Sequence, residues 1–569
     1  MPAKIKIATY TNSDDAFVVW VPDAVIPDCL GFALERARTK NGKEIVEVLD
    51  NRVGFAADSP KEGEHRPSTE WPFQRFDWTD HLVNDGDRVR YRATPMLLDA
   101  TTGKLKPGTP SPWSKWADLT PAAGKGFACY FNRGLVISQF MARYLKRRKL
   151  TLAAFKKELK KHDTPIRDFL MGDLGAGLFA LLAGAKKDAR KVHAALYELD
   201  DADLIDSLVA LKKDARVVLA NGSWSDKMVA GKKVPVPDQN AAERAALKAG
   251  GVDVSDRLLK RGLLGHNKFL AITDAAEKPL AVWTGSTNWT TTGLCTQVNN
   301  GLLITDAAVA QLYLDQWKRL KAAGNDFPPA LVAANDLPKS AKVGTTPVKV
   351  QFTRTSAGQD TAALKKLIAD AKEGILFLMF TPGGKGLDFD IAARLGDPKF
   401  FVQGVVSDID QKNGGLNFLE VELVADGAPK KQRFTEIVQP QGIAGGFASW
   451  AAEVSRRQFK SQVGHAIVHS KVIVIAPFGA DPVVITGSHN MSGNASAKND
   501  ENFVVIRSHA ALARAYAVNI VSVYQHYRWR AFLRDMLAKG KKPFSHLNPK
   551  PDWLPRALKN KAKDLAFWL

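Results

Sequence analysis

The chain has 569 residues, 45% of them hydrophobic, which is enough for three or four domains with cores of their own. Its formal net charge of +21 indicates an anionic partner, such as nucleic acid, a lipid surface or a phosphate-bearing substrate. Three cysteines are too few and too scattered for a disulfide framework or a zinc site.

The beginning of the chain lacks the apolar core of a signal peptide, and no apolar run of 18 residues predicts a membrane span. We therefore expect a cytoplasmic protein, or one exported by a route that needs no signal peptide. The apolar stretch at 170–185 is expected to form a buried helix rather than a membrane-inserting flap, because the same order of elements recurs later in the chain.

Residues 1–118 form a separate β-rich region in this interpretation. Clusters of Pro, Gly and Asp separate short runs of strand-forming residues, at 5–10, 16–21, 31–35 and 88–93. This spacing, with five tryptophans for a core or an interface, predicts an antiparallel β-sandwich similar to fibronectin type III or immunoglobulin-like modules. Such a domain would either bind a surface or partner, or brace the rest of the chain.

The rest of the chain alternates strand and helix patterns twice. The strand–helix–strand order occurs first at 192–198, 201–211 and 215–219, and again at 375–381, 389–395 and 400–406. A linker rich in Pro and Ala, at about 327–347, separates the two stretches. The pattern predicts an α/β protein with two pseudo-symmetric halves, residues 119–335 and 336–569, each a mixed sheet with helices on both faces.

Four polar residues lie in an apolar frame within the first half: His266, Lys268, Ser286 and Asn288. His266 and Lys268 are two residues apart, so on a strand they project from the same face. The apolar run that follows predicts a strand covered on both sides, and a second strand then returns Gly-Ser-x-Asn beside the histidine. Gly285 permits close backbone approach or a positive φ at that point.

The same set recurs 203 residues later as His469, Lys471, Ser488 and Asn490. The histidine and serine are 20 residues apart in the first copy and 19 in the second. A single H-x-K would usually mark an ordinary surface strand, but two matched copies indicate one site assembled from both halves. We expect the two imidazoles to face each other across one cleft, within roughly 6 Å, so that both reach one phosphorus.

The paired pattern resembles the phospholipase D superfamily, whose signature is H-x-K-x4-D followed by G-S-x-N. The resemblance covers roughly residues 130–540, with departures. Asp274 lies one place later than the signature aspartate, and Ala476 replaces it in the second copy. The acidic residue expected after G-S-x-N is present as Glu501, whereas the first copy has Asn299 and Asn300. The resemblance implies that Asp274 and Glu501 support the site rather than react.

Two imidazoles that meet on a phosphodiester can divide the chemistry between them. One attacks phosphorus as neutral imidazole, and the other protonates the leaving oxygen as imidazolium. Water, activated by the second histidine, then cleaves the phosphohistidine. The two lysines and the two asparagines supply positive charge and donors to the equatorial oxygens, and the two serines hold the site by hydrogen bonds. This route needs no metal and no cofactor.

The symmetry of the motifs does not itself assign the two histidine roles. The resemblance implies that His266 is the nucleophile and His469 the general acid and base. Glu501 is expected to orient a histidine through its other ring nitrogen. His465 and His489 have no role in this interpretation, although the position of His489 inside G-S-x-N would allow it to touch substrate.

Three functions remain open from the sequence. Hydrolysis of phospholipids to phosphatidic acid and an alcohol, with alcohol exchange as a side reaction, is favoured by Trp289 beside the motif, by Leu263 and Leu264, and by apolar residues at 566–569. A non-specific nuclease is the alternative that the net charge favours, although no DNA-binding module is recognisable. A non-enzymatic binding scaffold conflicts with the retention of both His-Lys pairs. We expect a monomer without a stable protein partner, because one chain supplies both halves.

Overall fold

The computed structural model describes residues 3–569 except 41, 62, 135–143, 145–146, 230–231, 381–385, 408–418, 426–427, 435–436, 439–467, 539 and 541–545. The chain forms two compact units. Unit 1 contains Met1–Pro121, Arg514–Ser522 and Phe532–Leu569, and unit 2 contains Ala122–Ala513 and Val523–Ala531. The long helix α13 (Ala510–Ala538) contributes segments to both.

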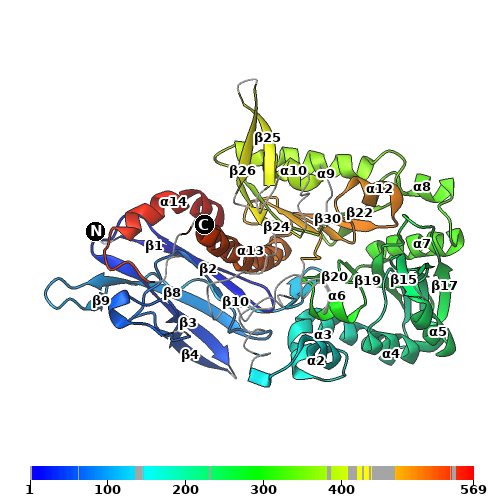
Figure 1. The fold of residues 1–569 in the computed structure, drawn as a ribbon, viewed down its shortest axis with the longest axis horizontal. Coiled ribbons are helices and arrows are strands. Elements are labelled where there is room, and N and C mark those ends of the chain that lie inside the picture. The colour runs from blue at the N-terminus through cyan, green and yellow to red at the C-terminus, as the bar shows by residue number, and fades with distance from the viewer. Residues whose placement is uncertain are drawn as a thin grey trace. The chain divides into compact units, whose positions relative to one another are not determined.

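Unit 1 is built on antiparallel sheets with the strand orders β1-β2-β7 and β10-β8-β3-β4 (Figure 1). Its strands are β1 (Ile5–Thr11), β2 (Ala16–Pro22), β3 (Cys29–Lys40), β4 (Lys43–Val48), β5 (Asp50–Asn51), β6 (Arg66–Pro67), β7 (Asp77–Asp80), β8 (Arg88–Leu98), β9 (Leu105–Pro107) and β10 (Ala117–Asp118). Burial alternates along β8, as expected for a strand with one face toward a core. The predicted antiparallel β-rich region is confirmed, and its likeness to fibronectin or immunoglobulin-like modules stays a prediction.

The last helix, α14 (Trp553–Trp568), also belongs to unit 1. The indole nitrogen of Trp553 donates to the carbonyl of Cys29 at 2.8 Å. The ring of Trp568 lies 4.6 Å from that of Phe17 and is 4% exposed. Helix α14 therefore packs with the β-rich region. The domain boundaries at 118 and 335 stay predictions.

Unit 2 contains two eight-stranded sheets of matching order (Figure 1). The first half has β11 (Ala122–Gly124), β12 (Phe127–Phe131), β13 (Lys191–Leu196), β14 (Ala215–Ala220), β15 (Ser225–Val229), β16 (Lys232–Val236), β17 (Asp253–Arg257), β18 (Lys268–Thr273), β19 (Pro279–Gly285) and β20 (Asn300–Ile304). Its helices are α2 (Leu152–Leu159), α3 (Pro165–Lys187), α4 (Ala202–Leu211), α5 (Ala241–Ala249), α6 (Thr291–Cys295) and α7 (Ala307–Ala323). The sheet order is β11-β12-β20-β19-β18-β13-β14-β17.

The second half repeats this order strand for strand as β21-β22-β30-β29-β28-β23-β24-β27. Its strands are β21 (Lys339–Val343), β22 (Thr346–Phe352), β23 (Gly374–Met379), β24 (Phe401–Val406), β25 (Leu419–Ala425), β26 (Ala428–Phe434), β27 (Ile437–Val438), β28 (Val472–Ile475), β29 (Val483–Gly487) and β30 (Asn502–Arg507). Its helices are α8 (Pro329–Asn335), α9 (Gln359–Asp370), α10 (Leu387–Ala393) and α12 (Gly493–Lys498). Each sheet mixes parallel pairs, such as β13 with β14, with antiparallel ones, which confirms the predicted fold class.

Helix α3 is the one helix among the described residues that is long and apolar enough to cross a membrane, with a mean hydropathy of 1.4. No membrane span was predicted from the sequence, because this segment contains no uninterrupted apolar run of 18 residues. Leu170, Leu174, Leu178 and Leu182 of this helix are buried in the core of the first half, among residues of β13 and β14. This packing accounts for the apolar composition of the helix, as expected for a core helix.

Candidate active site

The two motif copies occupy the centres of the two sheets. β18 and β28 follow His266 and His469, and each pairs antiparallel with the strand that returns Gly-Ser-x-Asn, β19 or β29. A Cβ on Gly285 would lie 2.3 Å from the carbonyl oxygen of Asn300, and one on Gly487 would lie 2.2 Å from that of Asn502. Only glycine fits these contacts. The close backbone approach that the sequence predicted at Gly285 is confirmed, and Gly487 shows the same contact in the second half.

The imidazole of His266 is held by a residue of the second half. Its Nδ1 lies 2.9 Å from Oε2 of Glu501, and both side chains are buried. The other carboxylate oxygen of Glu501 accepts a hydrogen bond from Asn499 at 2.9 Å. The ring of His266 packs edge-on against that of Tyr197, with centroids 4.6 Å apart. The orienting role expected for Glu501 therefore has a matching contact, although its effect on the reaction stays a prediction.

The imidazole of His469 is held by the first half in the same manner. Its Nδ1 lies 2.9 Å from Oδ1 of Asn299, which also accepts a hydrogen bond from Ser286 at 2.7 Å. The ring of Phe380 lies 4.8 Å from that of His469, in the place that Tyr197 occupies beside His266. Each half thus holds the histidine of the other half. A carboxylate of the second half holds His266, and an amide of the first half holds His469.

The two lysines make the same contacts in both copies. Each ammonium donates to the carbonyl oxygen of the histidine two residues before it, Lys268 to His266 and Lys471 to His469. Each lies 4.9 Å from the centroid of the neighbouring aromatic ring, which belongs to Tyr197 or to Phe380. These contacts leave further N–H groups on both lysines for an anion.

Burial dominates the electrostatics of the lysines. It lowers the pKa of Lys268 to about 7, although the carboxylates of Glu501 and Glu198 act in the opposite direction. Burial and the charge of Lys268 place the pKa of Lys471 well below its ordinary value. The site therefore concentrates basic groups with few counter-charges, and a bound phosphodiester would supply the missing negative charge.

The histidines show the same effect. Burial lowers the pKa of His266 to about 4, and Glu501 opposes this shift. Burial, together with the charges of Lys471 and Lys268, lowers the pKa of His469 further. Both imidazoles are therefore poised as neutral bases before an anion binds.

The serines and asparagines of the two G-S-x-N copies lie at the ends of β19 and β29. Ser286 accepts a hydrogen bond from the backbone of Asn300, and Ser488 accepts one from Asn502, both at 3.0 Å. The amide nitrogen of Asn288 donates to Glu198 at 2.7 Å. Asn490 is partly exposed, and its side-chain oxygen has no partner among the described residues.

Polar side chains also join the two halves reciprocally. Thr284 donates to Asn502 at 2.7 Å, and Asn300 donates to Thr486 at 2.9 Å. These two bonds join equivalent positions of the two halves, with the threonine as donor in the first and as acceptor in the second. They align β19 with β29 and so fix the register in which the histidines meet their partners.

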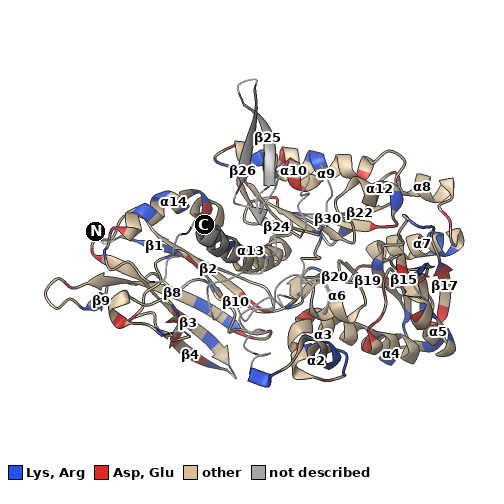
Figure 2. Cartoon of the chain, viewed as in Figure 1, with Lys and Arg blue, Asp and Glu red and all other residues tan. Residues whose placement is uncertain are grey.

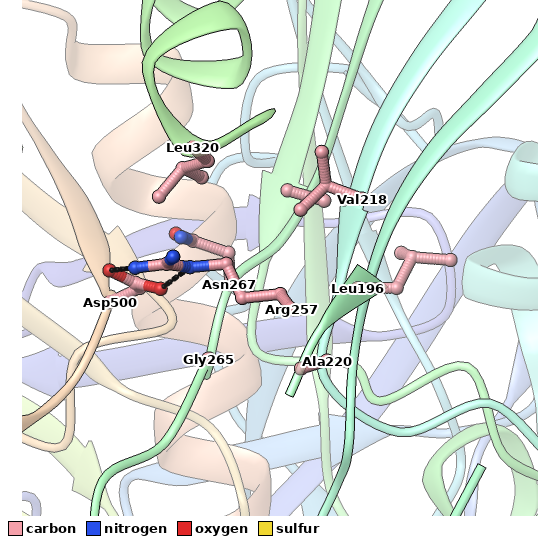
Figure 3. A pocket seen from close by; sticks show the side chains of 9 residues that line it. Leu196, Val218, Ala220, Arg257, Gly265, Asn267, Leu320 and Asp500 are labelled. Atoms are coloured by element: carbon pink, nitrogen blue, oxygen red, sulfur yellow. Dashed lines mark hydrogen bonds and ion pairs between the residues drawn. The ribbon is translucent and has the colours of Figure 1, made fainter. Parts of the chain in front are cut away.

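A buried ion pair between Arg257 and Asp500 adds a further contact between the halves, with an N–O distance of 2.6 Å (Figure 3). Both side chains are 1% exposed. They line a small pocket together with Gly265 and Asn267, which flank His266 in the sequence (Figure 3). The pocket thus lies on the first-half side of the segment that presents the histidine.

Two residues that the sequence singled out lie apart from the two histidines or are fully engaged elsewhere. Asp274 accepts a hydrogen bond from the backbone of Lys278 in the turn after β18, at the other end of that strand from His266. His489 is fully buried and lies 3.1 Å from Asp360, so it does not present a free face to substrate. Burial raises the pKa of Asp360, but the hydrogen bonds from His489, Ser496 and Thr355 and the charge of His489 together outweigh burial and lower the pKa to about 2.

Two of the apolar features that favoured a lipid substrate are also engaged inside the protein. Trp289 is 1% exposed and lies in the core of the first half. Trp568 packs in unit 1. Leu263 and Leu264 are half-buried.

Sequence reasoning missed Tyr197, Glu198 and Phe380. All three follow the last residue of a strand, β13 or β23, that lies next to the H-x-K strand in its sheet. The ends of neighbouring strands meet at one edge of a sheet, so the polar pair after an apolar run was the available signal. His465 lies outside the described residues.

A family model described as "Cardiolipin synthase, PLD-like domain" matches residues 178–321 and 420–522, which contain both motif copies. The chain is therefore similar to this family over these two segments. One matched segment lies in each half, in keeping with the sheet order that the two halves share. No curated protein matches the chain in sequence.

Several solved structures align with the chain at low similarity. The phosphatidylserine synthase of Haemophilus influenzae is 13% identical over 69% of this chain and 92% of its own, with a TM-score of 0.38. The polyphosphate kinase of Porphyromonas gingivalis is 11% identical over 88% and 74%, with a TM-score of 0.36. The phospholipase D family member Nuc of Salmonella typhimurium is 17% identical over 32% and 95%, with a TM-score of 0.20.

Proposed function

We propose that the protein is a metal-independent phosphodiesterase that acts through a phosphohistidine intermediate. The observation that carries the proposal is the reciprocal exchange of histidine partners. Because Nδ1 of each imidazole is engaged by the opposite half, Nε2 is the nitrogen left for substrate on both rings. Two such nitrogens from two halves are what an in-line displacement at phosphorus requires.

The different partners of the two rings support the assignment of their roles. His266 faces the carboxylate of Glu501, which stabilises the positive charge that a ring gains when it attacks phosphorus. His469 faces the amide oxygen of Asn299, which orients the ring without a compensating charge. A proton on His469 is therefore the more readily given up. We assign His266 as nucleophile and His469 as general acid and then general base.

The charge on the transferred phosphoryl group would be met by the lysines. Lys268 and Lys471 lie buried beside the two rings and retain N–H groups for the equatorial oxygens. Among the described residues there is no group of three or more His, Cys, Asp or Glu side chains that could hold a metal ion. The proposal that no metal takes part rests on the lysines and is tested below.

We propose a phospholipid as substrate, cleaved to phosphatidic acid and an alcohol. The support is the description of the matching family as a cardiolipin synthase, whose chemistry concerns lipid phosphodiesters. An alcohol that replaces water would give transphosphatidylation. A non-specific nuclease remains the second candidate because of the net charge of +21. Figure 2 shows Lys and Arg interspersed with Asp and Glu along the ribbon.

The test is product analysis with phosphatidylcholine vesicles, phosphatidylethanolamine vesicles and plasmid DNA, side by side in excess chelator. We expect phosphatidic acid from at least one lipid and intact plasmid. Cleavage of plasmid alone would replace the lipid substrate by nucleic acid. Activity that chelator abolishes and a divalent ion restores would contradict the metal-independent mechanism, and a soluble diester controls for effects of ions on the vesicles.

A further inference from the structure

Glu198 is a largely buried carboxylate beside the candidate site that the proposed mechanism does not use. Its Oε2 accepts a hydrogen bond from Nδ2 of Asn288 at 2.7 Å, and its Oε1 accepts one from Ser223 at 3.3 Å. Burial raises the pKa of Glu198, and the neighbouring charge of Lys268 opposes this shift. The carboxylate therefore belongs to the same electrostatic cluster as the catalytic lysine.

The contacts around Glu198 place Asn288 in the surroundings of His266. Tyr197, the residue before Glu198, packs against the ring of His266 and lies under the ammonium of Lys268. The hydroxyl of Tyr197 bonds to Ser223 at 2.6 Å, which joins the two neighbours of Glu198 in one network. Asn288 is thus bonded to Glu198, the residue next to the tyrosine that packs against His266.

The bond to Glu198 fixes which way the amide of Asn288 faces. A carboxylate accepts hydrogen bonds, so the nitrogen of the amide must face it and the oxygen must face elsewhere. Within the described part of the chain that oxygen is buried without a hydrogen-bond partner, and Asn288 as a whole is 4% exposed. For Asn490, its counterpart in the second half, the described residues provide no such carboxylate neighbour.

We propose that Glu198 and Asn288 form a subsite that selects phosphodiesters carrying a hydrogen-bond donor, a hydroxyl or a primary ammonium, on the substituent beside the first half. The non-bridging oxygens of the phosphate only accept hydrogen bonds, so they cannot satisfy the oxygen of Asn288. A hydroxyl or an N–H group of the substituent can. This inference rests on the proposed phosphodiesterase function and specifies its substrate.

Two head groups separate donor capacity from charge. Ethanolamine and choline carry the same positive charge, but the primary ammonium has three N–H donors and the quaternary ammonium has none. A buried acceptor left unpaired costs about 1–3 kcal/mol, which corresponds to about 5- to 150-fold in kcat/KM. Phosphatidylglycerol, whose head group carries hydroxyls without a positive charge, distinguishes a hydroxyl from an ammonium as the source of the donor.

The experiment compares vesicles of phosphatidylethanolamine, phosphatidylglycerol and phosphatidylcholine with identical acyl chains, with phosphatidic acid as the measured product. We expect kcat/KM for at least one of the two donor-bearing lipids to exceed that for phosphatidylcholine by tenfold or more. In Glu198→Gln, the NH2 group of the new glutamine can donate to the oxygen of Asn288. The amide of Asn288 can then rotate by half a turn, so that its oxygen no longer has to face the substrate. We expect the preference to fall at least threefold in this variant.

Ser223→Ala is the matched control, because it removes a bond to Glu198 without touching the bond between Glu198 and Asn288. We expect it to retain the preference. Equal kcat/KM for all three lipids in the unaltered protein, or an unchanged preference in Glu198→Gln, would overturn this inference and leave the proposed function in place. Absence of cleavage of every lipid would overturn this inference and the phospholipid substrate, whereas the phosphodiesterase function would fail only if plasmid DNA and the soluble diester also stayed intact.

Discussion

Replacement of Glu501 by Gln tests the role of the carboxylate behind His266. The change keeps the size of the side chain and removes the charge, and its single oxygen can keep the hydrogen bond from Asn499 while an NH2 group replaces the oxygen that faces His266. A hydrogen bond to a buried charged group contributes about 1.5–3 kcal/mol. If that stabilisation develops with the positive charge on the attacking ring, kcat/KM falls about 10- to 150-fold.

The pH profile of Glu501→Gln gives a second, independent readout. A nucleophilic imidazole must be neutral, so activity falls as the pH drops below the pKa of His266. The carboxylate raises that pKa against the effect of burial, which holds it at about 4. Its removal lowers the pKa further, so the acid limb of the kcat/KM profile should move to lower pH even as the maximum rate decreases.

The assay is hydrolysis of bis(p-nitrophenyl) phosphate in excess chelator, followed from about pH 2.5 to 9 so that a limb below pH 4 is observed. Asn299→Asp is the matched control, because it places a carboxylate behind His469 instead and should move the limb that His469 governs upward. An unchanged kcat/KM in Glu501→Gln would refute the role of the carboxylate in the reaction. An acid limb that moves to higher pH would refute the electrostatic reasoning itself.

The remaining predictions concern the two histidines and the stability of unit 2. With an activated diester, His469→Ala should accumulate phosphoprotein labelled at His266, and His266→Ala should carry no label. Mass spectrometry of the quenched protein identifies the labelled residue. Label on His469 would show that the two histidines have the opposite roles. The pKa of Asp360 lies at about 2, below the ordinary value of an aspartate, so its carboxylate stabilises the fold above pH 4 by about 2 kcal/mol and this contribution is lost as the pH falls toward 2. Urea unfolding should therefore show Asp360→Asn less stable than the unaltered protein at pH 6, with the difference disappearing near pH 2; a constant difference would contradict the assignment. Arg257→Met should lower the free energy of unfolding by about 3–5 kcal/mol because it strands the buried Asp500, and Arg257→Met combined with Asp500→Leu should recover most of it; a double variant as unstable as the single one would argue against an unpaired charge as the cause.

The sequence predicted the central strands of both sheets because their signals are local. An H-x-K pair followed by an apolar run, and a glycine before Ser-x-Asn, each lie within a few residues of one another. Gly285 and Gly487 have the close contacts expected of them, since a backbone that approaches within van der Waals distance leaves no room for a side chain. The repeat of the whole arrangement then indicated two halves.

The rest depended on contacts that no local pattern contains. Asn288 meets Glu198 across 90 residues of sequence, at the ends of strands that are not neighbours in the chain. From the sequence, Trp289 and the apolar residues at 566–569 were expected to favour a lipid substrate. Trp289 and Trp568 are instead buried, because elements distant in the sequence cover them. Burial of an aromatic ring is decided by tertiary packing, which the composition of its own segment does not specify.

Each histidine is hydrogen-bonded by a residue of the opposite half. This arrangement gives a single chain a property that a dimer of identical chains lacks. In a dimer of identical halves related by a twofold axis, the residue behind each imidazole is the same by symmetry. Joining the halves in one chain removes that constraint, and here the two positions differ, as Glu501 and Asn299. Covalent linkage therefore lets each substitution act on one imidazole alone, so that two rings of common design can be tuned separately for attack and for proton transfer.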